Sequence, residues 1–328
     1  MSEPIRWGIL SSARIGRRFA QGVAKTDSSV VSAVASRTEQ HAKDWAREIG
    51  AEHALVGYES LLEADFVDAI YNPLPNNLHA EWTIRALEAG KPVLCEKPFT
   101  ATAAEAEQVA EVSRHTGVLV CEAFMYRFHP MYDRLVELIN AGEIGEVVSI
   151  HAKFGFALEN KLDIRKQAEL AGGSLMDVGC YCVNFARRIA GEEPSRVTAF
   201  ERRTSVDDSL AGLLEFPKGI LGTVESSIES QLGREAKIRG TKGRIVLPEA
   251  WMPGETHAEF IIEQGGKRRV ETTPGADPFQ LEAEDFVTAL REGSPGRWPV
   301  QDAVHNMRVI DALYESARSG QEVVMPIP

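Results

Sequence analysis

The chain has 328 residues, of which 44% are hydrophobic and 26% charged, a composition typical of a globular protein. Its formal net charge of −12 disfavours nucleic acid and anionic membrane surfaces as partners, because both would repel it. No apolar run approaches the roughly 20 residues that cross a bilayer. The N-terminus lacks an export-signal pattern, so a cytoplasmic protein is expected. This length exceeds one ordinary core, which predicts two domains.

The four cysteines show no CxxC pair and no histidine at metal-ligand spacing. They are Cys95, Cys121, Cys180 and Cys182. Reduced, buried thiols are therefore expected, with neither a disulfide framework nor a metal site.

Strand and helix signals alternate up to residue 124. Buried strands are predicted at 5–10, 30–36, 67–75, 91–98 and 117–126. The helices predicted between them span 13–25, 38–50, 77–90 and 102–117. Alternation of this kind predicts a parallel sheet with right-handed crossovers. Residues 1–124 are therefore interpreted as a doubly wound α/β domain of the Rossmann type.

The pattern changes in the second half of the chain. A helix at 129–142 is followed by a long strand at 146–157 and a helix within 172–191. Strand-rich runs with hairpin signals follow at 209–230 and 258–273, and amphipathic helices at 280–293 and 302–320 close the chain. Residues 125–328 are therefore predicted to form an α+β domain with a largely antiparallel sheet.

The turn after the first strand resembles a dinucleotide phosphate turn that has lost glycines. Ser11, Ala13 and Gly16 occupy the three positions of G-x-G-x-x-G. Serine is tolerable at the first position unless a positive φ is required, and alanine adds one methyl at the second. Amides at the helix start would still face a phosphate. Taken alone, the turn fits a plain strand–turn–helix equally well.

The end of the second strand bears on the cofactor. An NAD site places an acidic residue there, against the ribose 2′-hydroxyl, whereas this strand ends with Ser36, Arg37 and Thr38. An arginine flanked by two hydroxyls suits a 2′-phosphate, so NADP is favoured over NAD. The alternative is a solvated surface arginine.

Lys97 follows another predicted strand, at the sheet edge where open α/β sheets bind ligands. Pro98 keeps Lys97 out of helical geometry. A lysine there can bond a substrate oxygen or cofactor ribose and assist proton transfer. The alternative is a surface lysine beside Glu96.

Asp177 and Tyr181 are four residues apart and would share a helix face. Asp177 could orient a substrate hydroxyl, and Tyr181 could exchange its proton near a lysine ammonium, which lowers a phenol pKa. The alternative is a capping aspartate and a packing tyrosine.

Five further residues are candidate cofactor or substrate contacts, and each could instead have a packing role. Asn76 and His79 begin a helix near the expected nicotinamide, and His79 could instead be satisfied by backbone groups. Arg127 lies where the domains join, and Arg165 and Phe279 could line a substrate cleft.

In combination, the segments "EKP", "GGSLMDVGCY", "PLPNNLHAEW", "GILSSARIG" and "EAFMYRFHP" resemble the Gfo/Idh/MocA oxidoreductases. The similarity is greatest to the branch of glucose–fructose oxidoreductase, NADP-dependent xylose dehydrogenase and dihydrodiol dehydrogenase. It implies a Rossmann domain, a C-terminal domain for substrate binding and oligomerisation with a large open sheet, and a homodimer or homotetramer. It also implies that Lys97, Asp177 and Tyr181 are catalytic, with Tyr181 where many members have histidine.

The expected activity is NADP(H)-dependent hydride transfer on a sugar, polyol or diol. The predicted cofactor contacts are Ser11, Ser12, Ala13, Arg14, Ile15, Ser36, Arg37, Thr38, Asn72, Pro73, Leu74, Asn76, His79, Glu96 and Lys97. The predicted substrate contacts are Lys97, Arg127, Arg165, Asp177, Tyr181 and Phe279. Two alternatives are a sugar–sugar oxidoreductase that retains NADP and a nucleotide-sensing regulator without catalysis.

Overall fold

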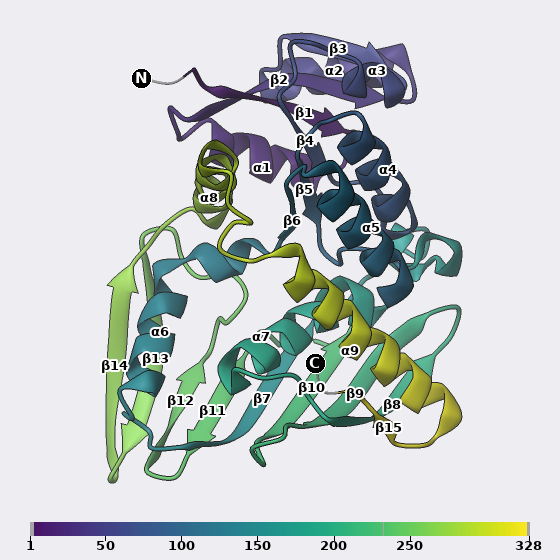
Figure 1. Ribbon diagram of the computed structural model, residues 1–328. Helices are drawn as coiled ribbons and strands as arrows, with labels where there is room; N and C mark the ends of the chain where they lie inside the picture. The colour runs from purple at the N-terminus through teal and green to yellow at the C-terminus, as the bar shows by residue number, and fades with distance from the viewer. Residues whose placement is uncertain (1–2, 232, 327–328) are drawn as a thin grey trace. The chain divides into compact units, whose positions relative to one another are not determined.

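The computed structural model describes residues 3–231 and 233–326, which belong to two compact units (Figure 1). The first unit contains the chain up to residue 128 together with residues 277–304. The second contains residues 129–276 and the chain from 305 onward. The predicted domain boundary, after residue 124, lies close to residue 128, where the chain first passes from one unit to the other. Residues 277–304 later return to the first unit.

The first unit has a six-stranded parallel sheet in the order β3-β2-β1-β4-β5-β6. Its strands are β1 Ile5–Leu10, β2 Ser29–Ser36, β3 His53–Val56, β4 Ala69–Asn72, β5 Val93–Glu96 and β6 Val120–Ala123. Its helices are α1 Ile15–Val23, α2 Glu39–Ile49, α3 Glu59–Leu62, α4 Asn76–Glu88 and α5 Ala103–Thr116. The Rossmann prediction is confirmed, and β3 and α3 are additions to the predicted elements.

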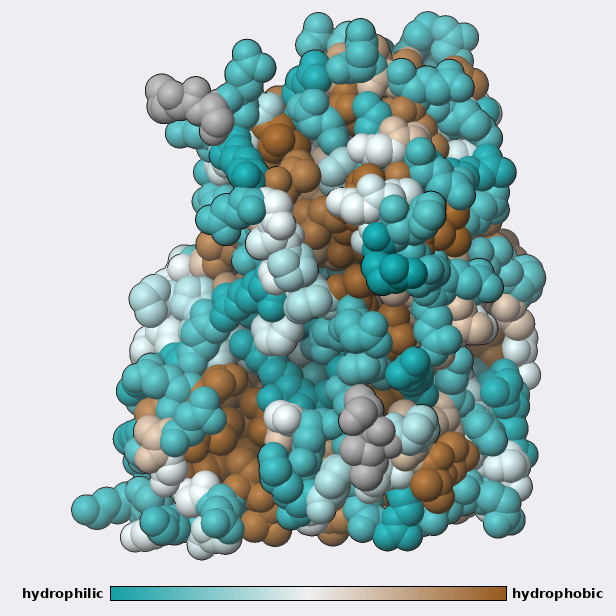
Figure 2. Space-filling model, in the orientation of Figure 1, coloured by the Kyte–Doolittle hydropathy of each residue, from teal (hydrophilic) through white to brown (hydrophobic). Residues whose placement is uncertain are grey.

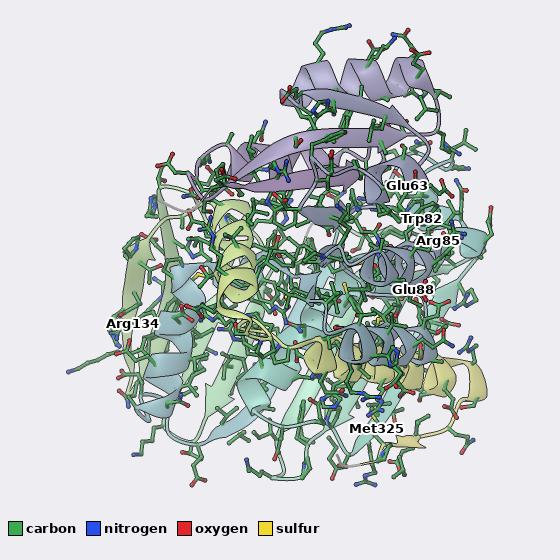
Figure 3. The ribbon with its side chains drawn as sticks, turned by 45° about the horizontal axis from the view of Figure 1, so that its top comes forward. Glu63, Trp82, Arg85, Glu88, Arg134 and Met325 are labelled. Carbon is green, nitrogen blue, oxygen red and sulfur yellow. The ribbon has the colours of Figure 1, made fainter. Side chains whose placement is uncertain are left out.

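Local sequence signals explain these elements. The central strands are continuously apolar because helices cover both faces of a parallel sheet, as the buried run from Trp7 to Leu10 shows. Thr38 and Thr102 cap α2 and α5 by accepting backbone N–H bonds. On the outer side of α4, the Arg85 guanidinium lies 4.7 Å from the Trp82 ring centroid (Figure 3).

The helix α8, Pro278–Glu292, belongs to the first unit although sequence patterns assigned it to the C-terminal domain. It packs against α1 at Gly22, where an added Cβ would lie 2.7 Å from the backbone nitrogen of Gln280. Only glycine permits this approach. Asp277 caps α8 and forms an ion pair with Lys25 at 2.6 Å.

The second unit is built on a nine-stranded sheet in the order β14-β13-β12-β11-β7-β10-β9-β8-β15. Neighbouring strands are antiparallel except β7 and β10, which run parallel. The predicted large, mostly antiparallel sheet is confirmed. The strands are β7 Val147–Gly155, β8 Arg196–Arg203, β9 Asp207–Glu215, β10 Leu221–Ser227, β11 Ala236–Gly240, β12 Gly243–Leu247, β13 His257–Gln264, β14 Lys267–Pro274 and β15 Val323–Val324.

Helices cover one face of this sheet (Figure 1). They are α6 Pro130–Asn140, α7 Cys180–Ala190 and the part of α9, Val300–Ser319, that follows residue 304. α7 lies on β7 and β10, and Ser316 of α9 accepts a bond from the Ala199 backbone nitrogen of β8. The other face is open, since Phe200, Leu213 and Leu221 are 57–75% exposed there.

Hydrophilic side chains cover much of the molecular face in Figure 2, with apolar patches between them. All four cysteines are buried, and none of them forms a disulfide bond. Among the described residues, no helix is long and apolar enough to cross a membrane.

Candidate active site

The phosphate turn follows β1 and begins with an unusual backbone conformation. Ser11 has φ +77°, so the first fingerprint position does require the left-handed region that glycine favours. The Ser11 Oγ accepts a bond from the Ala13 nitrogen at 3.2 Å, and the Ser11 nitrogen donates to Ala35 O at 2.9 Å. The turn therefore keeps the backbone geometry that glycine favours, and the Ser11 side chain stabilises it through the bond from the Ala13 nitrogen.

The remaining turn residues lead into α1. Ser12, Ala13 and Ile15 are partly exposed, and Arg14 is exposed at the N-cap of α1. The first turn of α1 contains no acidic residue, so its amides and positive dipole end suit an anion. Gly16 is not required for packing, because a Cβ there would meet Ile9 at an ordinary 3.6 Å.

The end of β2 carries the cofactor-selecting side chains. Ser36 is buried, whereas Arg37 and Thr38 are exposed, and the Thr38 hydroxyl caps α2. Residues 35–38 include no carboxylate. The Arg37 charge acts on Tyr58, whose pKa is raised by burial and lowered in part by Arg37. A cation at the end of β2 fits a 2′-phosphate rather than a free 2′-hydroxyl.

The segment from Asn72 to His79 closes the connection between β4 and α4. The buried Asn72 amide donates to His79 O and Thr83 Oγ1, at 3.2 and 3.1 Å, and its carbonyl accepts from the Leu74 nitrogen. Pro73 and Leu74 are buried, and Asn76 is partly exposed at the start of α4. The Asn72 side chain therefore holds the loop in its conformation, with Leu74 buried and Asn76 partly exposed.

His79 is buried and fixes the segment that bears Lys97. Its Nδ1 lies 2.8 Å from Pro98 O and its Nε2 lies 2.7 Å from Leu74 O. Burial lowers the pKa of His79 to about 4, and the Lys97 ammonium acts in the same direction. At neutral pH the ring is therefore uncharged, and its single N–H donates to one of these two carbonyl oxygens. The ring is held by backbone carbonyls, and its predicted role as a cofactor contact stays a prediction.

Lys97 follows β5 at the carboxyl edge of the sheet and is partly exposed. Its backbone nitrogen donates to Glu96 Oε2 at 3.2 Å, and the Lys97–Pro98 peptide bond is cis. Glu96 in turn accepts a bond from the Tyr71 hydroxyl, and Glu122 accepts one from the Phe99 nitrogen at 3.0 Å. Contacts with side chains of β4, α4 and β6 therefore hold residues 96–99, the segment that carries Lys97.

Arg127 and Phe279 are packed within the first unit. The Arg127 side chain is 1% exposed, donates to Asp302 at 2.6 Å and to Glu122 O at 3.1 Å, and lies over the Trp298 ring. Phe279 is 4% exposed beside α1. These contacts are those of the packing alternatives, so neither residue enters the functional proposal below.

In the second unit, Arg165 and Asp177 lie together. The Arg165 Nε donates to Asp177 Oδ2 at 2.8 Å and its Nη1 donates to Asp163 Oδ1 at 3.1 Å. Burial opposes the charge of Arg165, but the two carboxylates outweigh it and raise the pKa of the guanidinium. Gly172 allows this packing, since an added Cβ would lie 2.5 Å from Arg165 O.

Asp177 lies in a short π-helical segment, Leu175–Gly179, that runs directly into α7 and Tyr181. The predicted shared face of Asp177 and Tyr181 stays a prediction across this change of helix type. Tyr181 is 8% exposed, and its ring packs against Phe154 and Trp251 at centroid distances of 5.5 and 6.1 Å. These two rings hold the Tyr181 ring in place. A change of Tyr181 to phenylalanine would therefore remove the hydroxyl and keep the ring contacts.

Asp207 is a buried, hydrogen-bonded acid that the sequence patterns did not reveal. Its Oδ2 accepts bonds from Ser174 Oγ and the Leu175 nitrogen, at 2.9 and 2.7 Å, and its Oδ1 accepts from the Tyr314 hydroxyl at 2.7 Å. Asp207 thereby ties the start of the π segment to α9. Nothing in the segment "SVDDSL" distinguishes this aspartate from a strand-end acid.

A second overlooked acid is Glu282 on α8. Its side chain is buried, and neither carboxyl oxygen has a hydrogen-bond partner among the described residues. Burial and the nearby Glu96 carboxylate raise its pKa well above the usual range.

The comparisons agree with this architecture. Residues 5–124 match the model of an oxidoreductase family with an NAD-binding Rossmann fold, and residues 136–325 match the α/β C-terminal domain of the same family. The two matches define an oxidoreductase with one nucleotide-binding and one α/β unit. The chain belongs to the Gfo/Idh/MocA family, which confirms the resemblance seen in the sequence.

Curated relatives extend over most of the chain. A D-xylose 1-dehydrogenase (NADP(+)) from Haloferax volcanii is 40% identical, over 97% of this chain and 98% of the relative. A trans-1,2-dihydrobenzene-1,2-diol dehydrogenase from Xenopus tropicalis is 34% identical, over 84% of each chain.

A solved structure has the same fold. It is KijD10, a 3-ketoreductase from Actinomadura kijaniata in complex with NADP and TDP-benzene. It superposes with a TM-score of 0.90 at 33% identity, over 95% of this chain and 98% of that chain.

Proposed function

We propose that the protein is an NADP(H)-dependent oxidoreductase that acts on CH–OH groups of a sugar or a related polyol. The observation that carries this is the end of β2, where exposed Arg37 stands in place of an acidic residue. The named relatives support it, because one is an NADP-dependent xylose dehydrogenase and another a ketoreductase solved with NADP. The amides at the start of α1 would receive the pyrophosphate and Arg37 the 2′-phosphate.

The proposed catalytic residues are Lys97, Asp177 and Tyr181. Bound NADP supplies the redox chemistry, exchanging a hydride with the substrate carbon. Asp177, held by Arg165, orients a substrate hydroxyl. The Tyr181 Oη takes up or returns the hydroxyl proton as a general base or acid. The Lys97 ammonium binds a substrate oxygen.

The test is an initial-rate screen of aldoses, polyols and vicinal diols with NADP⁺ and NAD⁺, followed by absorbance at 340 nm. The matched variant is Arg37→Asp. A preference for NADP⁺ in kcat/KM that the variant abolishes supports the proposal. Equal use of both cofactors by the native protein would make Arg37 a surface residue. Gel filtration before the screen separates a dissociable dehydrogenase from a protein that retains its cofactor.

We further propose a homodimer or homotetramer formed through the open sheet face, in the cytoplasm. Support for the assembly comes from Phe200, Leu213 and Leu221, which expose large apolar side chains on β8, β9 and β10. Light scattering of the native protein and of Leu213→Glu measures it. A dimer lost in the variant supports this face, and a monomeric native protein would contradict it.

A further inference from the structure

The π segment that carries Asp177 is capped by a residue from a distant part of the chain. The segment begins after Ser174, whose own side chain makes no capping bond. Asp207, the first residue of β9, supplies the cap instead. Its Oδ2 accepts from the Leu175 nitrogen at 2.7 Å and from Ser174 Oγ at 2.9 Å. A carboxylate suits this place, because the first amides of a helix lack intrahelical acceptors and carry partial positive charge.

The C-terminal helix α9 supports this cap. Its Tyr314 hydroxyl donates to the other carboxyl oxygen, Asp207 Oδ1, at 2.7 Å. Asp207 is 1% exposed, and burying a carboxyl group costs free energy that its hydrogen bonds must offset. Three donors from two separate segments do so here, and together they fix the position of the carboxyl group.

The backbone next to the cap fits only because residue 173 is glycine. Gly173 has φ +125°, a conformation that residues with side chains rarely adopt. A Cβ at this position would overlap Asp207 Oδ1 and would lie 3.0 Å from the Tyr314 hydroxyl. The Asp207 carboxyl group thus occupies the space that a side chain at position 173 would need.

Gly173 links the cap to Asp177. Its carbonyl oxygen accepts from the Asp177 nitrogen at 3.0 Å, and its own nitrogen donates to Arg165 O at 2.8 Å. Arg165 in turn donates from its Nε to the Asp177 carboxylate. The backbone of Asp177 therefore depends on the segment that Asp207 holds, while its side chain is held by Arg165.

The residue that Asp207 engages also begins the π turn. The Leu175 oxygen accepts from the nitrogen of Cys180, five residues further on, which is the bond that defines a π turn. Such turns are rare and occur mostly as single turns inside α-helices, frequently at functional sites. We expect a segment released from Asp207 to relax toward the α-helical spacing of α7, which would change the direction of the Asp177 side chain.

We propose that Asp207 is a positioning residue of the substrate site, which holds the start of the π segment so that the Asp177 carboxylate meets the substrate hydroxyl. This inference rests on the proposed function, because Asp207 acts only through Asp177. In this role Asp207 touches neither the substrate nor the cofactor. Its loss should therefore weaken substrate binding more than it slows the chemical step.

Steady-state kinetics on the best substrate compares Asp207→Ala with Asp207→Asn. Alanine removes all three bonds, so we expect KM to rise about tenfold while kcat changes less than about threefold. The asparagine amide can accept from the Leu175 nitrogen and donate to the Tyr314 oxygen, so KM should stay within about threefold of the native value. An asparagine variant as impaired as the alanine variant would overturn the proposed hydrogen-bonding role.

Tyr314→Phe keeps the proposal testable if Asp207→Ala does not fold. It removes one bond to the cap and keeps the ring, so we expect KM to rise about threefold at nearly unchanged kcat. A fall in kcat at unchanged KM, in this variant or in Asp207→Ala, would overturn the positioning role. Fluorescence titration with NADP should give the native affinity for both variants, and a weakened affinity would also overturn it.

A double-mutant cycle shows whether Asp207 acts through Asp177. If it does, adding Asp207→Ala to Asp177→Asn leaves kcat/KM within about twofold of the value for Asp177→Asn alone. Two losses that multiply would give Asp207 an independent role and overturn the proposal. An unimpaired Asp177→Asn would contradict the proposed function, and this inference with it. An impaired Asp177→Asn beside an unimpaired Asp207→Ala would contradict this inference alone.

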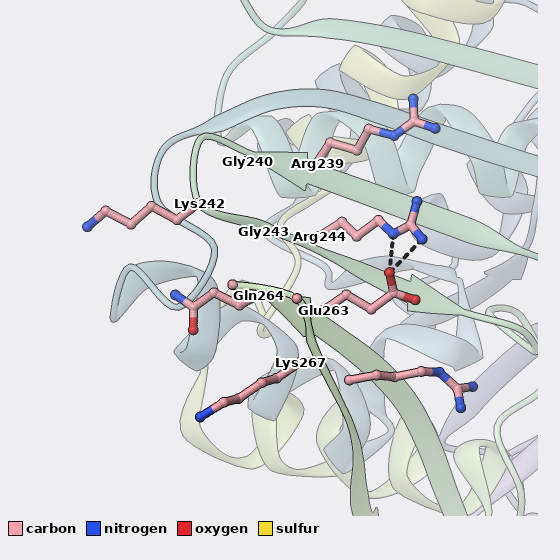
Figure 4. A pocket seen from close by; sticks show the side chains of 11 residues that line it. Arg239, Gly240, Lys242, Gly243, Arg244, Glu263, Gln264 and Lys267 are labelled. Atoms are coloured by element: carbon pink, nitrogen blue, oxygen red, sulfur yellow. Dashed lines mark hydrogen bonds and ion pairs between the residues drawn. The ribbon is translucent and has the colours of Figure 1, made fainter.

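The matched control is Glu271→Gln on β14. Like Asp207, Glu271 joins a strand to a helix of the second unit, because it accepts from Arg134 Nε of α6 at 2.7 Å. Five strands separate β14 from β9 in the sheet order. Figure 4 shows the hairpin turns at that end of the sheet, where Arg244 donates to Glu263 and no residue of the π segment lines the hollow. The control should therefore keep the native KM and kcat, and a KM raised as in Asp207→Ala would overturn the proposal.

Discussion

Arg165 joins two carboxylates, donating to Asp177 at 2.8 Å and to Asp163 at 3.1 Å. Its planar guanidinium holds both at once, which a lysine ammonium cannot reproduce. The arginine therefore orients the Asp177 carboxylate that we assign to substrate binding.

We therefore expect Arg165→Lys to raise KM about tenfold, equivalent to about 1.4 kcal/mol of binding, while kcat changes less than threefold. Steady-state kinetics on the best substrate measures both parameters. Lys161→Gln, an exposed change in the same loop, is the control. A large loss of kcat at unchanged KM would instead place Arg165 in the chemical step.

Replacing Tyr181 by phenylalanine removes only the hydroxyl, because the ring contacts with Phe154 and Trp251 remain. If Tyr181 is the acid/base, kcat falls roughly 10²- to 10⁴-fold with little change in melting temperature. The measurement is kcat at saturating substrate, with a deuterium isotope effect showing that chemistry limits the rate. An undiminished kcat under those conditions would exclude the assignment.

His79 makes folding stability depend on pH. Its pKa is about 4 when folded and about 6.5 in an unfolded chain, so the unfolded state takes up a proton first on acidification. The stability that neutral His79 provides is complete above pH 6.5 and is lost progressively down to about pH 4. The loss amounts to about 3 kcal/mol.

Urea unfolding of the native protein and of His79→Gln from pH 7.5 to 4 measures this dependence. The difference between the two proteins cancels other titrating groups. It should shrink as the pH falls through this window, and a difference that stays constant with pH would contradict the assignment.

Ser11 holds a positive φ that glycine adopts without cost. Left-handed geometry costs other residues about 1–2 kcal/mol, while glycine loses about 0.5–1 kcal/mol more backbone entropy on folding. Ser11→Gly should therefore be more stable than Ser11→Ala by about 0.5–1 kcal/mol. The alanine variant also loses the bond to the Ala13 nitrogen. Urea midpoints compare the two, and an alanine variant as stable as the glycine variant would show that the turn adapts.

Sequence patterns predicted what depends on local order along the chain. The apolar strands, the alternation of the first unit and the positions of Arg37 and Lys97 at strand ends all follow from short segments. These features need no knowledge of which segments meet in space.

The remainder depends on contacts between distant segments. The sequence predicted Arg127 as a ligand-binding residue. In the structure it pairs with Asp302, which lies 175 residues further along the chain. The assignment of α8 to the first unit rests on Gly22 meeting Gln280. Asp207 acquires its bonds from Leu175 and Tyr314, and no local pattern predicts either partner.

The return of α8 to the first unit has a consequence for how the protein is made. A ribosome that has released residues up to 128 has completed the parallel sheet but not the helix that covers α1. The groove at Gly22 stays exposed to water until some 150 further residues have emerged. The nucleotide-binding half is the first to be synthesised and among the last to be finished, so a truncation that removes residues 277–304 would damage the N-terminal fold.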